Sequence, residues 1–393
     1  MLAAAIVAAT YLGIAKDAAR WIDSQPTPSA DLYYGSPGVV LLDLNLYRAT
    51  GEAKYLERAK AAGDDLLTRI DAADDPGLYT GVAGIGYSLV ELWKTTSDAK
   101  YHDGAARCVI RIRQLGENTF DIISGTAGIG LFLLYASHEL HDPEALALAR
   151  CAADRLMETR AAETTGVSWA DTTSQVVMPN FSHGTAGAAY FLASIYLDTK
   201  ERRYLDAALE GGRHLISIAA TEGNECLIYH HTPGGENLYY LGWCHGPAGT
   251  ARLFYRLYQA THDPKWLQWV DRAAQSIIDS GIPERHTPGF WNNVSVCCGS
   301  AGVARFFLDL YRSRGDRKYL IFARRVAEQL IATATRDDDG ARWPQAEHRV
   351  KPELIVAQTG YMQGAAGIAS VLLDVDAVER GKSPRFTLPD SPF

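Results

Sequence analysis

A chain of 393 residues with 47% hydrophobic and 21% charged residues has the composition of a globular protein with a sizeable core. Its net charge of −8 argues against nucleic acid as the main partner, because phosphate binding requires a basic face. Six cysteines in a chain this long do not form a disulfide scaffold, and the adjacent Cys297 and Cys298 favour metal binding. We therefore expect a cytoplasmic protein in a reducing compartment.

The first apolar stretch, residues 2–14, resembles the core of a signal peptide. It lacks a preceding basic segment and continues into residues 16–22 without a break that suggests cleavage. It is also too short to cross a bilayer. We predict that it forms the first helix and that the chain has no membrane span.

A Gly-x-x-Gly turn occurs seven times along the chain. The glycine pairs are Gly35/Gly38, Gly81/Gly84, Gly125/Gly128, Gly184/Gly187, Gly246/Gly249, Gly299/Gly302 and Gly364/Gly367. A segment with apolar residues at helical spacing precedes each turn, and these are residues 11–22, 55–67, 101–112, 145–157, 204–216, 266–278 and 319–331. A more apolar run follows each turn, such as residues 129–134.

Amphipathic helices belong outside and more apolar helices inside. The repeats therefore predict an all-α fold, an α/α toroid of seven helical hairpins with about fourteen helices. Length alone would suggest two or three domains. A closed ring of hairpins is one domain whatever its length, so we expect residues 1–393 to form a single domain.

Four insertions lengthen the later repeats, each between an outer helix and the next glycine turn. They are residues 161–181, 222–242, 281–296 and 333–363, and they are rich in aromatic residues, glycine, proline and histidine. All four precede the start of an inner helix, so we expect them at one mouth of the ring. Long loops on a rigid scaffold usually carry function.

Two of the glycine turns carry thiols. Cys244 stands before Gly246, and Cys297 and Cys298 stand before Gly299. A helix N-terminus has free N–H groups and a positive dipole end, which favour thiolates. Three thiolates from neighbouring turns match a tetrahedral zinc site with an open fourth position, which is the pattern of a catalytic centre.

The other cysteines are expected to play no part in the metal site. Cys108 and Cys151 lie in the middle of predicted helices among apolar residues, so we predict that both are core residues. Cys226 has no assignment.

Three motifs together resemble the lanthionine synthetase C-like (LanC-like) cyclase family, over essentially the whole chain. They are Trp243-Cys244-His245-Gly246, Ser182-His183-Gly184 and Asp121-Ile122-Ile123-Ser124-Gly125. Members of this family are α/α toroids with a catalytic zinc. They add a cysteine thiol to dehydroalanine or dehydrobutyrine in a peptide and so close thioether (lanthionine) rings.

The resemblance implies that Cys244 and Cys297 bind Zn²⁺ and that His183 and Asp121 serve proton transfer. The commonest family pattern at the second site is Cys-His-Gly, whereas Cys298 stands in the histidine position here. Cys298 would then be a third thiolate ligand, as in a branch found among fused synthetases. The tyrosine or histidine that follows the first zinc cysteine in the family is His245. Some cyclases also have an arginine one turn before that cysteine, where this chain has Tyr240.

The mechanism that we expect follows from charge. Zinc with three thiolates carries one net negative charge, which leaves a bound substrate thiolate more nucleophilic. The enolate formed by its attack needs a proton, and His183 and His245 are both candidates because imidazole titrates near neutrality. Asp121 either orients His183 or acts itself.

Each of these residues also has a simpler interpretation. His183 and Asp121 could be helix caps, and His245 could bond only to a neighbouring loop. His230, His231, His286 and His348 are expected to be polar groups of the loops. The aromatic loops could pack on one another without a ligand.

Three classes of function remain open. The first is a peptide cyclase acting on a dehydrated precursor peptide, either alone or as part of a larger synthetase with a dehydratase or kinase partner. The second is an enzyme that adds glutathione or another thiol to dehydroamino acids in damaged proteins. The third is a non-catalytic peptide-binding toroid. A sugar-processing α/α barrel is a more distant alternative, because it needs a carboxylate pair and no metal.

Overall fold

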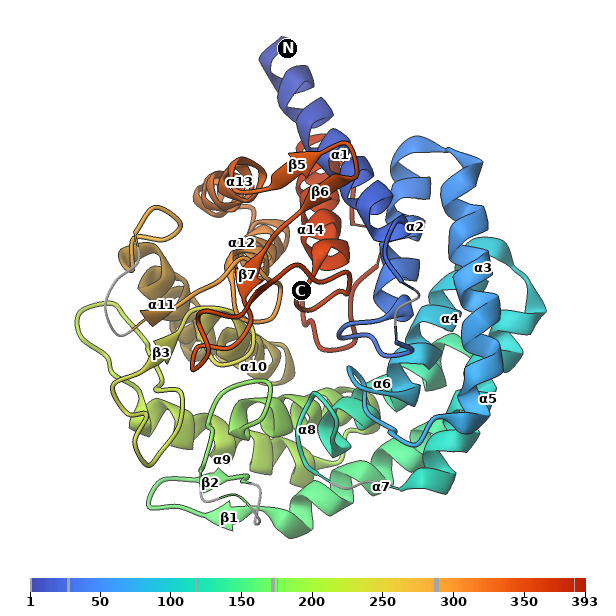
Figure 1. Ribbon diagram of the computed structural model, residues 1–393. Coiled ribbons are helices and arrows are strands. Elements are labelled where there is room, and N and C mark those ends of the chain that lie inside the picture. Colours follow the sequence, from blue (N-terminus) through green and yellow to red (C-terminus); the bar gives the residue numbers. More distant parts are fainter. Residues whose placement is uncertain are drawn as a thin grey trace.

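The computed structural model describes residues 2–26, 29–116, 119–170, 174, 176–285, 290–384 and 386–393. Within these ranges fourteen α-helices form two concentric rings, which confirms the predicted α/α toroid (Figure 1). The inner ring consists of α2 (Ser36–Thr50), α4 (Val82–Thr96), α6 (Thr126–Glu139), α8 (Thr185–Thr199), α10 (Pro247–Thr261), α12 (Ser300–Arg314) and α14 (Ala365–Glu379). The outer ring consists of α1 (Leu2–Asp23), α3 (Ala53–Arg69), α5 (Ala99–Leu115), α7 (Pro143–Thr159), α9 (Arg202–Ile218), α11 (Lys265–Asp279) and α13 (Arg317–Ala332).

Burial separates the two rings as the apolar pattern predicts. In α8 every residue from Thr185 to Ile195 is buried, because the helix has neighbours on all sides. In α3 only Tyr55, Ala59, Gly63 and Leu66 are buried, and their spacing defines one face of the helix. The inner helices therefore form the core, and each outer helix covers it with a single stripe.

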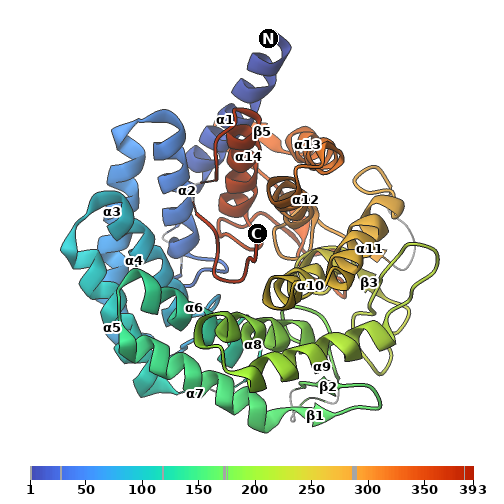
Figure 2. The ribbon, with the colours of Figure 1, turned by 180° about the vertical axis from the view of Figure 1, so that it is seen from behind.

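The pairing of the helices differs from the predicted order of outer helix followed by inner helix. Each inner helix from α2 to α12 packs against the outer helix that follows it, while α14 packs against α1. In these six hairpins a short turn joins the inner helix to the outer helix that follows it. The connection from an outer helix to the next inner helix is longer, because it contains the glycine turn or an insertion. The seventh pair joins segments from opposite ends of the sequence and closes the ring between α14 and α2 (Figures 1 and 2).

The second glycine of each turn is required by space. A Cβ atom on Gly249 would lie 1.8 Å from the carbonyl oxygen of Trp243, and one on Gly367 would lie 1.7 Å from that of Tyr361. No side chain fits at such distances, because the loop that enters each inner helix folds back over its first turn. The repetition of Gly-x-x-Gly thus records a packing constraint that recurs around the ring.

The four insertions add short strands to the helical fold. The strands are β1 (Ala161–Ala162), β2 (Val167–Ser168), β3 (Tyr239–Tyr240), β4 (Phe290–Trp291), β5 (Thr335–Asp337), β6 (Gly340–Arg342), β7 (Gln345–Ala346) and β8 (Ile355–Val356). Strands β3 and β4 pair in parallel, and Val177 bridges to Thr232. The backbone N–H of Val294 donates to Oε1 of Gln345. Each insertion therefore bonds to the next one, as expected for loops at one mouth.

Parts of two insertions lie away from the mouth. The β1–β2 hairpin packs on α9, and β6 packs on α1. No helix within the described ranges is long and apolar enough to cross a membrane.

Candidate metal centre and proton-transfer site

Seven backbone hydrogen bonds link the loops that enter the inner helices into a closed ring. The N–H donors and C=O acceptors are Tyr33 to Tyr79 (2.8 Å), Tyr79 to Ile123 (2.9 Å), Ile122 to Ser182 (3.0 Å), Ser182 to Cys244 (2.9 Å), Cys244 to Cys297 (3.0 Å), Cys297 to Met362 (2.9 Å) and Met362 to Tyr33 (3.0 Å). The loops are therefore held in register with one another. A side chain at a given position of one loop lies beside its equivalents in the neighbouring loops.

This register explains which residues meet at the site. Cys244 and Cys297 stand at the same distance before the second glycine of their turns, at Gly249 and Gly302. The equivalent position holds Tyr33, Tyr79, Ile123, Ser182 and Met362 in the other turns. The next position holds Tyr34, Thr80, Ser124, His183, His245, Cys298 and Gln363. The candidate ligands and histidines thus occupy two adjacent positions of consecutive loops.

The three predicted ligand cysteines form one cluster. Sγ of Cys244 lies 3.1 Å from Sγ of Cys298, which lies 3.5 Å from Sγ of Cys297. All three sulfur atoms lie within 4.8 Å of one another. Three sulfurs at the Zn–S bond length in a tetrahedron are about 3.8 Å apart, so the cluster fits zinc with small adjustments. Cys244 and Cys297 are buried, and Cys298 is partly exposed.

The helix N-termini are expected to lower the pKa of these thiols, but without a metal this holds only for Cys298. Burial raises the pKa of Cys244 and of Cys297, because their loops place the sulfurs inside the ring. Hydrogen bonds from Cys244 and Cys297 lower the pKa of Cys298. The positive ends of the helices do not outweigh desolvation for the two buried thiols. A cation in the cluster would reverse this balance, because it favours the thiolates.

Two residues that the sequence reasoning missed donate hydrogen bonds to the cluster. The Tyr33 hydroxyl lies 3.1 Å from Sγ of Cys297, and Nε2 of Gln363 lies 3.9 Å from Sγ of Cys298. Nε2 of Gln363 also donates to the Tyr33 hydroxyl at 3.0 Å. Donors of this kind stabilise negative charge on metal-bound sulfur. Their positions before Gly38 and Gly367 match those of Cys297 and Cys298, so an alignment of the seven turns could have found them.

Asp121 and His183 contact each other beside the thiols. Oδ2 of Asp121 lies 2.5 Å from Nδ1 of His183. Oδ1 of the same carboxylate accepts the backbone N–H groups of Ser124 and Gly125, each at 2.9 Å, directly before α6. Asp121 therefore bonds both to the His183 ring and to the loop that enters α6, but its side chain does not cap this helix. Burial lowers the pKa of His183, but the hydrogen bond and charge of Asp121 outweigh it, so that the net pKa is raised.

His245 lies close to His183 but has different partners. The two rings are stacked with centroids 5.8 Å apart, and Nε2 of His245 lies 3.4 Å from the hydroxyl of Ser182. Nδ1 of His245 is buried without a hydrogen-bond partner among the described atoms. Burial lowers the pKa of His245 well below the ordinary value, with His230 adding to the effect. His245 is therefore neutral in this environment.

The cluster and the histidines open on a cavity of about 300 Å³ at the mouth of the ring. His230 contributes to its wall and packs on His245, with ring centroids 4.2 Å apart. Burial lowers the pKa of His230 to about 4. His348 and Trp291 also line the cavity, whereas His231 bonds to His230 at its edge. His286 lies outside the described residues.

Arg349 brings a positive charge to this cavity from the fourth insertion. It lines the wall and its positive charge acts on Tyr240, where it opposes the effect of burial that raises the pKa of Tyr240, while its Nε atom has no hydrogen-bond partner among the described residues. An arginine from a distant loop thus stands next to Tyr240. Nothing in the irregular sequence around Arg349 could have predicted this contact.

The aromatic residues of the insertions fall into two groups. Tyr240 and Trp291 line the cavity. Trp169 and Trp343 are buried and donate their indole N–H groups to the carbonyl oxygens of Leu156 and Leu330, at 2.8 and 2.7 Å. The second group fastens the insertions to the ends of α7 and α13, so it serves packing only.

The remaining cysteines confirm one prediction and correct another. Cys108 is fully buried in α5, as predicted. Cys151 is exposed, and its assignment to the core was wrong. The buried face of α7 consists of Ala145, Ala149, Ala152, Ala153 and Leu156, and Cys151 points away from it. Cys226 is buried beside α11, where its N–H donates to Ser276.

Comparison with known proteins identifies the family. Residues 27–388 match the model of the family described as lanthionine synthetase C-like protein, so the chain belongs to this family. Its fold is similar to that of nisin cyclase, with a TM-score of 0.70, 17% identity and coverage of 92% of both chains.

More distant similarity of fold extends to other helical toroids. An α-1,6-mannanase from Salegentibacter sp. HEL1_6, an inactive variant in complex with α-1,6-mannotriose, matches with a TM-score of 0.52 and 15% identity, over 76% of this chain and 88% of that one. The Lin0763 protein from Listeria innocua matches with a TM-score of 0.52 and 12% identity, over 76% of this chain and 84% of that one. At these identities the similarities concern the fold alone.

Proposed function

We propose that this protein is a zinc-dependent enzyme that adds a cysteine thiol to dehydroalanine or dehydrobutyrine in a peptide and forms a thioether ring. The observation that carries the proposal is the cavity shared by the three-cysteine cluster and His183, whose Nδ1 is bonded to Asp121. Membership of the lanthionine synthetase C-like family supports it. The substrate would be a dehydrated precursor peptide.

Cys244, Cys297 and Cys298 would hold the zinc. The bound ion would supply an open coordination position and favour the thiolate form of the substrate. Tyr33 and Gln363 hold two of the ligand sulfurs by hydrogen bonds and so fix their orientation. Residues of three insertions line the cavity, among them His230, Trp291 and Arg349.

His183 serves as base and then as acid. Its Nδ1 is bonded to Asp121, which leaves Nε2 to face the substrate. Nε2 takes the proton of the thiol, the sulfur forms a bond to the β-carbon, and the electrons of the C=C bond move to the carbonyl oxygen. Nε2 then returns the proton to Cα, so the net result is the addition of S–H across the double bond. Asp121 stabilises the imidazolium between the two transfers.

Arg349 is suited to the charge that develops on the carbonyl oxygen. Its guanidinium stands at the cavity wall, and a fixed cation at a developing enolate lowers the barrier to its formation. Tyr240 lies next to this guanidinium and is affected by its charge. His245 and His230, both with lowered pKa, form a neutral wall beside Tyr240.

The site fits the competing functions less well. A glycosidase needs two carboxylates across its substrate, and Glu347 is the only carboxylate among the described residues that line the cavity. A non-catalytic toroid would have no need for an intact cysteine cluster and an oriented histidine. Addition of glutathione to dehydroamino acids would use the same groups, so only the substrate separates it from cyclisation.

The test uses the purified full chain with measured zinc content. It is incubated with a peptide that carries one dehydroalanine and one cysteine, and remaining thiol is detected by alkylation and mass spectrometry. We expect about one zinc per chain and loss of alkylation as the ring closes. A second arm offers glutathione to a dehydroalanine peptide without cysteine, and preference for that arm would favour the second function.

Variants at the cysteines complete this test. Cys244→Ala should lose both zinc and activity, because two sulfurs remain for a site that needs three. Cys151→Ala is the matched control, since this thiol is exposed and lies on the outer ring. A parent protein that takes up no zinc even after reconstitution would contradict the proposal.

A further inference from the structure

Residues 384 and 386–393 of the same chain lie at the centre of the ring. Both views place the C-terminus inside the inner ring (Figures 1 and 2). The Pro384 carbonyl accepts from Arg48, the Thr387 carbonyl from Tyr87, and the Pro392 carbonyl from Gln259. The segment is thus bonded to α2, α4 and α10.

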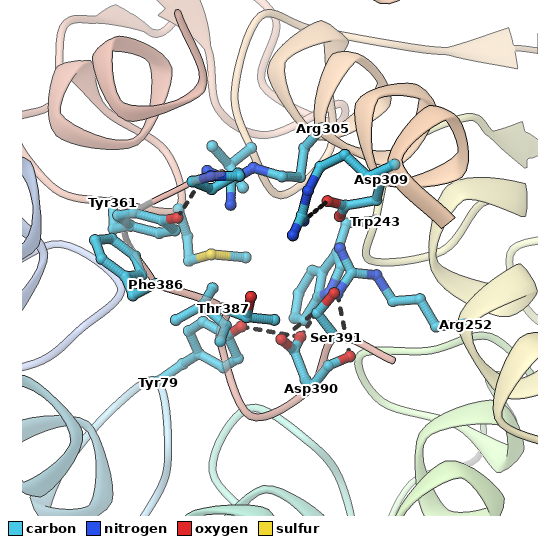
Figure 3. Close-up of a pocket in the computed structure, with 15 residues that line it drawn as sticks. Tyr79, Trp243, Arg252, Arg305, Asp309, Tyr361, Phe386, Thr387, Asp390 and Ser391 are labelled. Carbon is cyan, nitrogen blue, oxygen red and sulfur yellow. Dashed lines mark hydrogen bonds and ion pairs between the residues drawn. The ribbon is translucent and has the colours of Figure 1, made fainter. Parts of the chain in front are cut away.

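Asp390 belongs to this segment. Its side chain is fully buried. Oδ2 accepts the hydroxyl of Tyr79 at 3.0 Å and the indole N–H of Trp243 at 2.8 Å, as Figure 3 shows. Arg252 donates to the Asp390 carbonyl oxygen at 3.1 Å and lies 3.5 Å from Oδ1. A buried carboxylate requires such partners, so Asp390 holds all three groups in fixed positions.

Trp243 connects this carboxylate to the cysteine cluster. It immediately precedes Cys244, and the two side chains point to opposite sides of the loop. Trp243 faces the cavity that Asp390 lines, whereas Cys244 faces the cavity at the mouth of the ring. The Cβ atom of Trp243 lies 3.6 Å from where a Cβ on Gly302 would stand, directly behind the turn of Cys297 and Cys298. Trp243, on the loop of Cys244, therefore packs against the turn that carries the other two thiols.

We propose that Asp390 is a positioning residue for the metal centre: by fixing the Trp243 indole it holds the loop of Cys244 at the spacing from Cys297 and Cys298 that zinc requires. The proposal rests on the zinc site of the proposed function. Residues 384 and 386–393 would thus help to hold the ring from the inside. Asp390 touches neither substrate nor metal, so its effect appears first in metal affinity rather than in the chemical step.

The test measures the affinity of the full chain for zinc by competition with a chromophoric chelator, together with the thiolate-to-cobalt absorption of the Co²⁺ form. Asp390→Asn should bind zinc at least about tenfold more weakly and change the cobalt spectrum. Asp43→Asn is the matched control, since Asp43 of α2 is buried and forms an ion pair with Arg58 of α3. This control should lower thermal stability but leave zinc affinity unchanged.

A second variant reaches the same contact from the other side. Trp243→Phe keeps an aromatic ring and removes only the donor to Asp390 within the polar network, so it should weaken zinc binding in the same direction, even where Asp390→Asn fails to fold. The double variant should bind zinc no more weakly than the weaker of the two single variants, because both substitutions remove the same hydrogen bond between Asp390 and Trp243.

Three outcomes would overturn the proposal. Unchanged zinc affinity and cobalt spectrum in Asp390→Asn would show that the cluster does not depend on this carboxylate. An equal loss in Asp43→Asn would show only a general loosening of the ring. A parent chain that binds no zinc would remove the proposed function together with this inference, whereas the first two outcomes leave that function intact.

Discussion

Asp121 and His183 come from neighbouring loops of the ring, and Oδ2 of Asp121 lies 2.5 Å from Nδ1 of His183. The same carboxylate holds the start of α6 through the N–H groups of Ser124 and Gly125. The orientation of the histidine is therefore tied to the scaffold itself. This relationship makes separate predictions for the two residues.

His183 should matter for turnover and not for metal binding. His183→Asn removes the group that moves the proton but leaves the three sulfurs in place. We expect normal folding and zinc content, with a rate of thiol addition lower by on the order of 10²-fold or more. The rate is measured on a dehydroalanine peptide, and zinc is determined on the same sample. A variant as fast as the parent would reduce His183 to a structural residue of its turn.

Asp121→Asn should lower the pKa of His183. The raised pKa depends on the hydrogen bond and charge of Asp121, which overcome burial, and an amide supplies no charge. Because the neutral imidazole accepts the thiol proton, the acidic limb of kcat/KM should move to lower pH. The maximal rate should fall, since the tautomer is no longer fixed. NMR titration of the His183 ring measures the pKa directly, and an unchanged value would contradict the assignment.

The loss of stability in Asp121→Asn should also depend on pH. A raised folded-state pKa stabilises the fold below the ordinary histidine pKa, and this contribution is lost as pH rises through the folded-state value. Asp121→Asn should therefore lose stability mainly at acidic pH. Its amide oxygen still accepts the N–H groups of Ser124 and Gly125, whereas Asp121→Ala loses both hydrogen bonds and about 1 kcal/mol at every pH.

The seven glycine turns were sufficient to predict the toroid. They mark positions where backbone meets backbone, as at Gly249 and Gly367, and such a constraint is visible in sequence as a fixed residue type. The pairing of α1 with α14 was not predictable in the same way. It depends on contacts between the two ends of the ring, and no local pattern records them.

The sequence could indicate those residues of the candidate site whose side chains have a distinctive chemistry. Cys244, Cys297 and Cys298 stand out because thiols at glycine turns are unusual, and His183 and Asp121 follow from motifs. Tyr33 and Gln363 share the register of these residues but carry common side chains. Arg349 and Asp390 come from irregular segments, so only the three-dimensional structure brings them to the cavity and to Trp243.

Arg349 should affect the chemical step through its charge. Arg349→Gln keeps a hydrogen-bonding group on a shorter side chain and removes the cation, so kcat should fall by on the order of 10-fold to 10²-fold. Arg349→Lys should retain part of the activity. Arg113, an exposed residue of the outer ring, provides the control as Arg113→Gln. Equal rates for Arg349→Gln and this control would exclude stabilisation of the enolate by Arg349.

The last prediction concerns the third thiolate. Replacing Cys298 by histidine exchanges an anionic ligand for a neutral one, and imidazole is a competent zinc ligand. The variant should therefore still bind zinc, whereas Cys298→Ala should bind it weakly or not at all. A centre with two thiolates withdraws more electron density from a substrate sulfur, so it acidifies the thiol better but leaves it less nucleophilic. The two effects oppose each other and dominate at different pH.

A pH–rate profile separates these effects. At low pH, where ionisation of the thiol limits the rate, Cys298→His should approach or exceed the parent. Well above neutrality the thiol is already ionised, and Cys298→His should be slower because only nucleophilicity counts there. Zinc content is determined on the same samples. A variant that matches or exceeds the parent at every pH would contradict the argument from electron density. Full zinc occupancy and rate in Cys298→Ala would instead remove Cys298 from the ligand set and leave Cys244 and Cys297 with a partner among His183, His245 and the histidines of the loops.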